Sequence, residues 1–415
     1  MKKLLLIVLL LSLLLTTLYA EENDNALGFS AMKTKYISVD INIELPIYFS
    51  GYTSNDEFTY RTAVFYDSIA QQADFEAYYL DNNQNKVFAE IVSENGNKYA
   101  VFKIKPITRE EYIFYVSGTI ISENKIVLTN STGNLNDVPE DTKEYIKATR
   151  FIQSDSSEIR TVSNFIKESE DPLENLVAIT NWVHSYVTYD FDYVEVVNDS
   201  KKVLADRKGV CDEFAILEAA ILRAQGYPVK YVVGYANTSQ EWGPHAWLEV
   251  YVPGQEWIPV DPTYNEVGFV DSSHIVLEKL KDPVESKDSV SSTNKVSVVF
   301  GEKIQDFKHN QTKNFEEYGY GNVINMDVIA SKDALMESPY IVKLKLQNTT
   351  SNPVVILVVS QLAEDFVQLF PESRKTTYYI KPFDSKVVDY YFLLPKLDNS
   401  YIYGFAFSSQ FNGVE

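Results

Sequence analysis

Apolar and polar residues alternate in short runs from about residue 31 to residue 128. Runs such as YISVDINIEL and EYIFYVSGTIIS have the two-residue period of half-buried strands, and turn-like segments such as DNNQN and SENGN separate them. Short strands at this spacing are typical of a β-sandwich. We therefore place a β-sandwich-like domain at residues 21–137.

The pattern changes at about residue 139, where apolar residues recur at three- and four-residue spacing. The segments EDTKEYIKATRFIQ, SSEIRTVSNFIKES and PLENLVAITNWVHSYV are predicted helices, and Asp171 before Pro172 is expected to cap the last of them. The clearest helix should begin at about Cys211 and stop at Gly226. Because the strands VKYVVGYA, HAWLEVYV and EWIPVD follow, we place a mixed domain at residues 138–280.

The rest of the chain begins with a charged, serine-rich stretch at residues 281–297, which predicts a linker. Residues 298–415 again have the pattern of strands, and residues 338–362 resemble a hairpin with a polar turn. A C-terminal β-sandwich-like domain is expected there. The predicted fold class is α+β, with a central domain between two β-sandwiches.

The N-terminus has the layout of a targeting segment. Two lysines precede a nearly unbroken apolar run at residues 4–15, and Ala20 precedes an acidic segment. This order predicts a signal peptide at residues 1–20. An uncleaved N-terminal anchor is the alternative, because Leu18 is larger than cleavage sites usually accept. The signal peptide and the anchor both predict a secreted or cell-surface protein, and any membrane association would involve only residues 4–20.

Composition narrows the functional classes. Lys and Arg number 37 against 58 Asp and Glu, and the net charge of −21 argues against binding nucleic acid. One cysteine excludes a disulfide scaffold and a cysteine-clustered metal site, and the four histidines are widely spaced. We expect no metal and no cofactor. Nothing in the composition indicates an oligomeric state.

The lone cysteine, Cys211, lies in the sequence RKGVCDEFAILEAAIL. Gly209 allows a close backbone approach, and the positive end of the helix dipole favours a thiolate at the first helical residue. Asp212 and Glu213 oppose this slightly. A buried thiol that acts as a small hydrophobe is the alternative. We favour a functional thiol, because an unpaired cysteine outside the cell is open to oxidation.

His245 and Asp261 lie on one predicted β-hairpin. The two-residue period of HAWLEVYV places His245 on one face and leaves the other face fully apolar. If the hairpin closes around Pro253, His245 pairs with Asp261. A slip of one residue would separate their faces. The alternatives are a packed sheet histidine and an aspartate that belongs only to a turn.

The segments RKGVCDEFAILEAAILRAQGYPVKYVVGY, HAWLEVYV and WIPVDPT, in this order, resemble the transglutaminase-like superfamily, a relative of the papain-like cysteine proteases. The resemblance covers about residues 152–264. It implies that Cys211 is the nucleophile, that His245 is the general base and acid, and that Asp261 orients the histidine. It also implies an oxyanion hole made partly by the backbone N–H of Cys211.

Other aromatic and histidine residues receive weaker predictions. Trp242 and Tyr235, with Tyr189, are candidate substrate-binding wall residues, with ordinary aromatic packing as the alternative. His184 is expected to be structural. The remaining histidines, His274 and His309, lie outside the motif and are expected at the surface.

These features together predict an exported cysteine-nucleophile enzyme that transfers acyl groups from protein or peptide amides through a thioester. Hydrolysis is favoured over transfer to an amine, because water is abundant outside the cell. The alternative is a non-enzymatic cell-surface binding module that uses the central domain as a scaffold. A chain that cross-links itself or a neighbour would combine the two.

Overall fold

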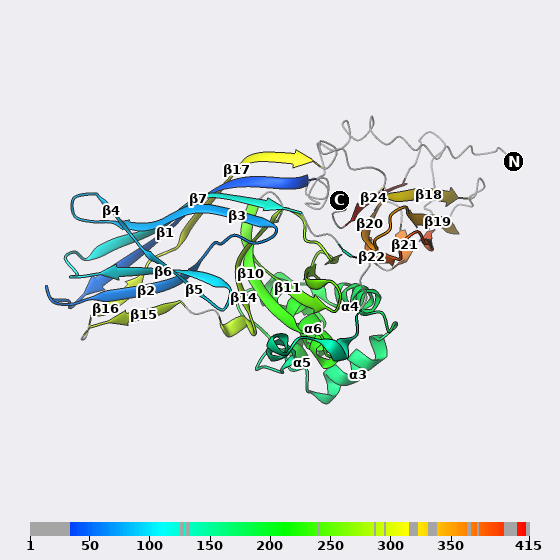
Figure 1. Ribbon diagram of the computed structural model, residues 1–415, viewed down its shortest axis with the longest axis horizontal. Coiled ribbons are helices and arrows are strands. Elements are labelled where there is room, and N and C mark those ends of the chain that lie inside the picture. The colour runs from blue at the N-terminus through cyan, green and yellow to red at the C-terminus, as the bar shows by residue number, and fades with distance from the viewer. Residues whose placement is uncertain are drawn as a thin grey trace.

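The computed structural model describes residues 34–124, 128–129, 133–238, 241–285, 288–293, 296–314, 323–330, 338–362, 367–371, 373–393 and 405–411. The predicted signal peptide lies outside these residues. Within them, no helix combines the length and apolar character that a membrane span requires. Figure 1 shows a β-sandwich on one side, a central helical domain beneath a sheet, and a second β-sandwich on the other side. The predicted α+β class with flanking β-domains is confirmed.

The N-terminal sandwich consists of two antiparallel sheets. One contains β16 (Ser297–Phe300), β1 (Thr34–Ser50), β7 (Glu111–Glu123), β3 (Gln71–Leu80) and β4 (Lys86–Phe88), with β17 (Ile304–Asn314) also paired to β1. The other contains β15 (Ser289–Ser292), β2 (Phe58–Val64), β6 (Asn97–Ile104) and β5 (Glu90–Glu94). Aromatic rings fill the space between the sheets, and Phe102 stacks on Phe114 with ring centroids 4.3 Å apart.

The predicted boundaries after residue 280 are wrong. The supposed linker at residues 281–297 contains β15, and β16 and β17 were assigned to the C-terminal domain, yet all three complete the N-terminal sandwich. Their backbone groups pair with β1 and β2, so they protect sheet edges that would otherwise be open. Local composition shows that this segment is polar, but it does not show which sheet the segment joins.

The central domain packs four helices against a five-stranded sheet. The helices are α3 (Ser157–Ile166), α4 (Pro172–Tyr186), α5 (Ser200–Asp206) and α6 (Cys211–Ala224). The sheet order is β13 (Glu266–Val267), β12 (Glu256–Asp261), β11 (Glu241–Val252), β10 (Val229–Thr238) and β14 (His274–Leu280). Short elements connect these: β8 (Thr188–Tyr189), β9 (Lys208–Gly209) and the 3₁₀ turns η1 (Leu135–Asp137), η2 (Glu140–Ile146), η3 (Phe191–Tyr193) and η4 (Pro283–Glu285).

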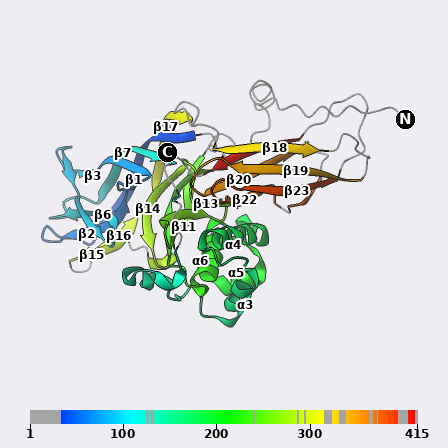
Figure 2. The same ribbon diagram turned by 45° about the vertical axis from the view of Figure 1, so that its right-hand side comes forward.

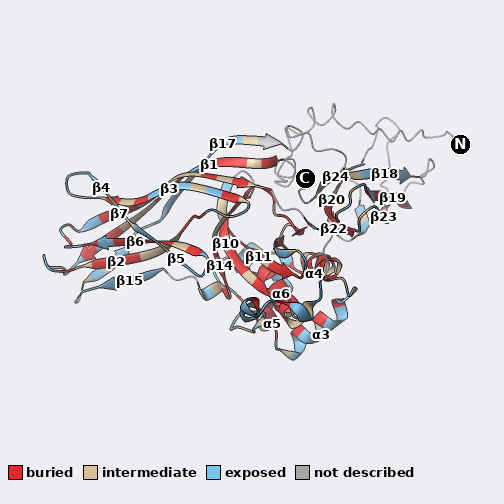
Figure 3. Cartoon of the chain, viewed as in Figure 1, coloured by how far each residue is buried: buried red, intermediate tan, exposed pale blue. Residues whose placement is uncertain are grey.

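Helix α6 is the centre of this core, and Figure 3 shows it as almost entirely buried. The apolar face of β11, with Ala246, Leu248 and Val250, packs in the same cluster as the helix. The Asp171 side chain accepts the N–H groups at the start of α4, as predicted. The first predicted helix, in contrast, is only the 3₁₀ turn η2.

The C-terminal sandwich also has two sheets. One contains β18 (Ile324–Ala330), β19 (Pro339–Asn348), β23 (Ser385–Leu393) and β21 (Val367–Phe370), and the other β22 (Lys375–Ile380), β20 (Val354–Leu362) and β24 (Phe405–Phe411). The predicted hairpin at residues 338–362 is wrong, because β19 and β20 lie in opposite sheets. Strand β20 is apolar on both faces, since Val355 packs into the central core and Val354 into the sandwich.

Polar contacts join the C-terminal sandwich to α4, which lies beneath β22 in Figure 2. The Asn181 side chain donates to Thr377 O at 2.7 Å and accepts from Thr377 N at 2.9 Å. Asn265, just after the strand that carries Asp261, donates to Lys375 O at 2.9 Å. The C-terminal sandwich therefore holds the loop that leaves Asp261.

Candidate active site

The start of α6 holds Cys211 in a fixed position. The backbone N–H of Val210 donates to Glu213 Oε2 at 2.9 Å, and Glu213 Oε1 accepts from Asn198 N at 3.0 Å. A Cβ at Gly209 would lie 2.5 Å from the Glu213 Cγ, which is too close for any side chain. The glycine of the Gly-Val-Cys sequence is therefore required so that the Glu213 carboxylate can close the helix N-terminus.

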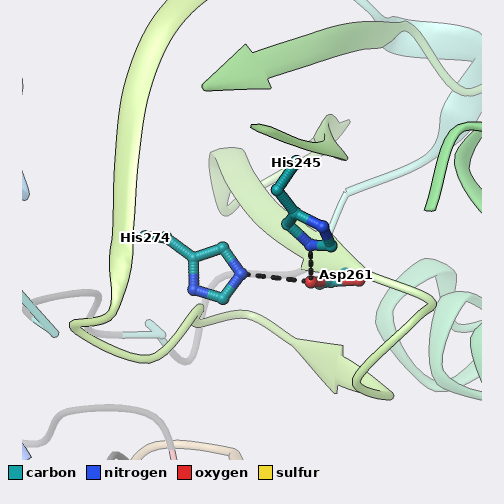
Figure 4. A group of neighbouring side chains, drawn as sticks. All are labelled: His245, Asp261 and His274. Carbon is teal, nitrogen blue, oxygen red and sulfur yellow. Dashed lines mark hydrogen bonds and ion pairs between the residues drawn. The ribbon is translucent and has the colours of Figure 1, made fainter. Parts of the chain in front are cut away.

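His245 and Asp261 meet as predicted, but by a different register. Leu248 pairs with Val260. The predicted register, in which His245 lies opposite Asp261, would instead place Leu248 opposite Ile258. The difference is two residues, which is one full period of a strand, so both side chains keep the same face. His245 Nε2 lies 2.8 Å from Asp261 Oδ2 (Figure 4).

The Asp261 carboxylate is fully buried and uses both of its oxygens. Oδ2 faces His245 and, at 3.1 Å, His274 Nε2, while Oδ1 accepts the backbone N–H groups of Thr263 at 2.7 Å and Tyr264 at 3.2 Å. Burial by itself raises the pKa of this carboxyl, but the two imidazoles outweigh burial and hold it well below its usual range. Asp261 is therefore a carboxylate at neutral pH.

The His245 ring packs against two aromatic side chains and is hydrogen-bonded to Asp261. It stacks on Tyr264 with centroids 5.2 Å apart and on Trp247 with centroids 5.8 Å apart. Because Nε2 faces Asp261, Nδ1 is the nitrogen left to exchange a proton with a nucleophile. On the neighbouring strand β10, Gly234 pairs with His245, and a Cβ there would meet Ile275 O and the Trp247 ring. The glycine thus permits this packing.

The Cys211 sulfur lies at the same strand. The backbone of Ala246, the residue after His245, favours the ionised thiol, while the negative charge of Asp261 disfavours it, so both lie near the sulfur. Only 8% of Cys211 is exposed, and burial raises the pKa of the thiol well above its ordinary value, with the Asp212 charge adding to the effect. The expected thiolate from the helix dipole is therefore absent in this conformation. The protonated thiol needs a base before it can act as a nucleophile.

The predicted wall residues separate into two groups. Tyr235 is buried in the N-terminal sandwich cluster, where its hydroxyl accepts from Gln305, and Trp242 stacks on Phe307. Tyr235 and Trp242 therefore have the ordinary aromatic packing role, which was the alternative to substrate binding. Tyr189 is 45% exposed, and burial raises its pKa to about 12, with the nearby Cys211 contributing. It is therefore the predicted wall residue that lies beside the nucleophile.

The other histidines differ in their outcomes. His184 is structural as expected: its Nδ1 lies 3.0 Å from Pro262 O and its Nε2 3.1 Å from Ser373 Oγ, and burial lowers its pKa to about 4. His309 is exposed as expected. His274 is not a surface residue, because it is 3% exposed and bonded to Asp261. In the sequence, the apolar run IVL directly after His274 was the only indication that this histidine is buried. The pairing of β14 with β10 brings His274 to the site.

The side chains of His245, Asp261 and His274 also form a candidate metal-ligand group. The ligand atoms of His245, Asp261 and His274 lie within 4.8 Å of one another, as do those of Glu266, Asp271 and His274. A bound transition metal would sit about 2.0–2.2 Å from each atom. In the first group, the atoms are already hydrogen-bonded to each other at 2.8 and 3.1 Å. We therefore interpret these residues as a proton network.

Glu218 lies on α6, two turns after Cys211, and is fully buried. Its Oε1 accepts from Thr180 Oγ1 at 2.6 Å, while Oε2 has no hydrogen-bond partner among the described residues. Burial, together with the negative charge of Asp261, raises the pKa of Glu218 to about 8. The carboxyl is therefore protonated in the folded protein at neutral pH.

We expect the Glu218→Gln variant to gain stability relative to the wild type as the pH rises. Between about pH 4.3, the ordinary value, and about pH 8 the folded wild type keeps a proton that the unfolded chain releases, so its stability falls over this range. The variant lacks this loss, and the difference between the two should grow by roughly 2–4 kcal/mol. Urea unfolding at pH 5 and pH 8 measures it. Glu170→Gln, at an exposed position, is the control. A difference that is the same at both pH values would contradict the assignment.

The comparisons with known proteins concern mainly the central domain. Residues 159–262 match the model of the Transglutaminase-like superfamily core, which confirms the resemblance for this part of the chain. The site described above lies within and directly after this segment.

Individual relatives differ in their names. An uncharacterized protein of Mycobacterium tuberculosis (strain H37Rv) is 34% identical over 128 residues, which are 27% of this chain and 40% of that protein. A protein-glutamine gamma-glutamyltransferase of Pseudomonas aeruginosa is 37% identical over 68 residues, 14% of this chain and 10% of that protein. Other matches are named Kyphoscoliosis peptidase, from Mus musculus, and Peptide-N(4)-(N-acetyl-beta-glucosaminyl)asparagine amidase, from Gallus gallus. The chain thus covers less than half of each of these relatives.

A solved structure from Cytophaga hutchinsonii, named "a Putative Cysteine Protease", has a TM-score of 0.50 and 19% identity. The match covers 68% of this chain and 93% of that one. It shows a shared fold that extends beyond the central domain. The chain thus contains a transglutaminase-like core whose relatives are named transferases, peptidases and amidases.

Proposed function

We propose that this protein is an exported cysteine-nucleophile enzyme that cleaves protein or peptide amides through a thioester. The observation that carries the proposal is the buried His245–Asp261 pair, joined across the hairpin of β11 and β12, with buried Cys211 beside Ala246, the residue after His245. Cys211, His245 and Asp261 can then act as the nucleophile, the base and the orienting carboxylate that acyl transfer uses.

In the proposed reaction, His245 Nδ1 takes the thiol proton and the sulfur of Cys211 attacks the amide carbonyl carbon. The backbone N–H of Cys211 stabilises the oxyanion. His245 then returns the proton to the departing amine, and the C–N bond breaks to leave a thioester. Water, deprotonated by His245, attacks the thioester and releases a carboxylic acid and the thiol. Asp261 keeps Nε2 protonated and stabilises the imidazolium in both steps.

Hydrolysis and amine transfer share the thioester, and one assay separates them. The purified protein is incubated with a peptide library and a labelled primary amine, and products are identified by mass spectrometry. New peptide termini in the wild type, absent in Cys211→Ala, are expected. Labelled adducts without new termini would replace hydrolysis by transamidation. If neither product depends on Cys211, the non-enzymatic binding module becomes the better interpretation.

An exposed apolar segment beside the nucleophile supports a peptide substrate with a large apolar side chain near the cleaved bond. Phe191 is 76% exposed, and Val194 and Val196 are exposed near it. Strand β8, just before this segment, pairs with β9, which leads into Cys211. The segment is therefore tied to the backbone that presents the sulfur.

Phe191→Ser is expected to raise KM for such a peptide by about tenfold and to change kcat little, because lost apolar contact weakens ground-state and transition-state binding alike. Steady-state kinetics with the peptide found in the library assay measures this. Phe165→Ser, at an 82% exposed position on α3, is the matched control and should leave KM unchanged. An equal KM for the Phe191 variant would show that the segment does not bind substrate.

A further inference from the structure

The triad carboxylate is shared between two imidazoles. Asp261 Oδ2 lies 2.8 Å from His245 Nε2 and 3.1 Å from His274 Nε2, and Figure 4 shows both rings converging on this oxygen. His274 comes from β14, on the far side of β10 from the hairpin that carries the other two residues. All three side chains are buried. The second imidazole is therefore part of the site and takes no part in the proposed reaction steps.

The hydrogen-bond partners of His274 define its protonation state. Its Nε2 faces the Asp261 carboxylate, and its Nδ1 faces Asp271 O at 3.1 Å and Asp271 Oδ1 at 3.3 Å. A backbone carbonyl and a carboxylate can only accept hydrogen bonds. Both ring nitrogens must then carry hydrogen, and His274 is an imidazolium.

The charges around this ring agree with that state. The His274 charge and hydrogen bonds from Ser273 hold the pKa of Asp271 below its usual range although burial opposes them. Burial raises the pKa of Glu266 well above its usual range, so its side chain is a neutral carboxylic acid, whose Oε2 accepts from the Asp271 N–H at 3.0 Å. Tyr264 packs edge-on against the ring at 5.7 Å and is also neutral, since burial raises its pKa.

We propose that His274 is a positioning residue of the site: Asp271 holds it as an imidazolium, and its charge and hydrogen bond fix the Asp261 carboxylate that orients His245. This inference rests on the proposed function. The fixed positive charge of His274 offsets part of the Asp261 carboxylate charge that faces the cysteine–histidine pair.

The test is the rate of iodoacetamide alkylation of Cys211 between pH 4 and pH 10, which needs no substrate. The alkaline limb of this profile reports proton loss from the coupled cysteine–histidine pair. We expect His274→Gln to move this limb upward by about one pH unit, which is a tenfold change in the proton affinity of the cysteine–histidine pair. Loss of the positive charge of His274 makes proton release from the pair less favourable. Asp271→Asn should move it in the same direction. His309→Gln, at an exposed histidine, is the matched control and should not move it.

The outcomes separate this inference from the proposed function. If the wild-type profile shows no limb that disappears in His245→Ala, the cysteine–histidine pair itself is absent and the proposed function fails with it. If that limb is present but stays in place in His274→Gln, with the rate lowered equally at all pH values, His274 is merely structural and only this inference fails.

If the His274→Gln and Asp271→Asn variants do not fold, a second measurement tests the protonation state of His274 in the wild type. Long-range ¹H–¹⁵N spectra of the histidine-labelled wild type resolve the protonation of each ring, and the chain has only four histidines to assign. We expect one ring with both nitrogens protonated at pH 8, which His184→Gln, His245→Gln and His309→Gln leave in place. If no ring is doubly protonated at pH 8, the inference is overturned.

Discussion

Replacing Cys211 with alanine is expected to abolish amide cleavage, lowering kcat/KM by about 10⁵-fold or more, because no other nucleophile replaces the thiol. The chain has no second cysteine that could substitute for it. The fold should persist: the helix start is closed by Glu213 and Val210, whose contacts do not involve the sulfur. Kinetics on the library-derived peptide, with the melting temperature measured in parallel, test this.

Cys211→Ser is the matched control for shape. Its hydroxyl has nearly the size of the thiol but is a much weaker nucleophile, so it should be inactive and fold as the wild type does. Activity of either variant within tenfold of the wild type would show that the reaction does not pass through a thioester. The central domain would then be a scaffold for another role.

Replacing Asp261 with asparagine should lower kcat by about 10⁴-fold, because an amide no longer fixes the productive histidine tautomer or stabilises the imidazolium. The structure adds a cost in stability. The carboxylate accepts four hydrogen bonds at a fully buried position, and an amide NH₂ would face either the two imidazoles or the N–H groups of Thr263 and Tyr264. We expect the free energy of unfolding to fall by about 3 kcal/mol.

Urea unfolding and single-turnover kinetics on the same preparation separate these two effects. Asp155→Asn, at an exposed position before α3, serves as the control and should change neither quantity. A normal kcat in folded Asp261→Asn would show that His245 is oriented without the carboxylate. In that case the triad would reduce to a cysteine–histidine pair.

Much of the site followed from local rules. Helix α6 begins at Cys211 and is followed by Gly226 at a positive φ of 94°, as the sequence predicted, because capping and apolar spacing act within a few residues. His245 and Asp261 share a face because a strand has a period of two, and that conclusion survived a register that was wrong by two residues.

The errors arose where distant segments pair. Strand β17 looked like part of a C-terminal domain, yet it pairs with β1 over 250 residues earlier in the chain. Likewise β19 and β20 are adjacent in sequence and have strand patterns, but lie in opposite sheets. Hydrophobic periodicity specifies which face of a strand is buried, and it carries no information about which sheet buries it.

The sequence by itself determined the transglutaminase-like core and the three residues of the candidate triad, because their spacing is set by one helix start and one hairpin. The tertiary structure alone decided the environment that controls them. Burial removes the thiolate expected at Cys211, and strand pairing brings His274 to Asp261. Desolvation and charge pairing depend on every neighbour in three dimensions, so proton affinities at this site are a property of the whole fold.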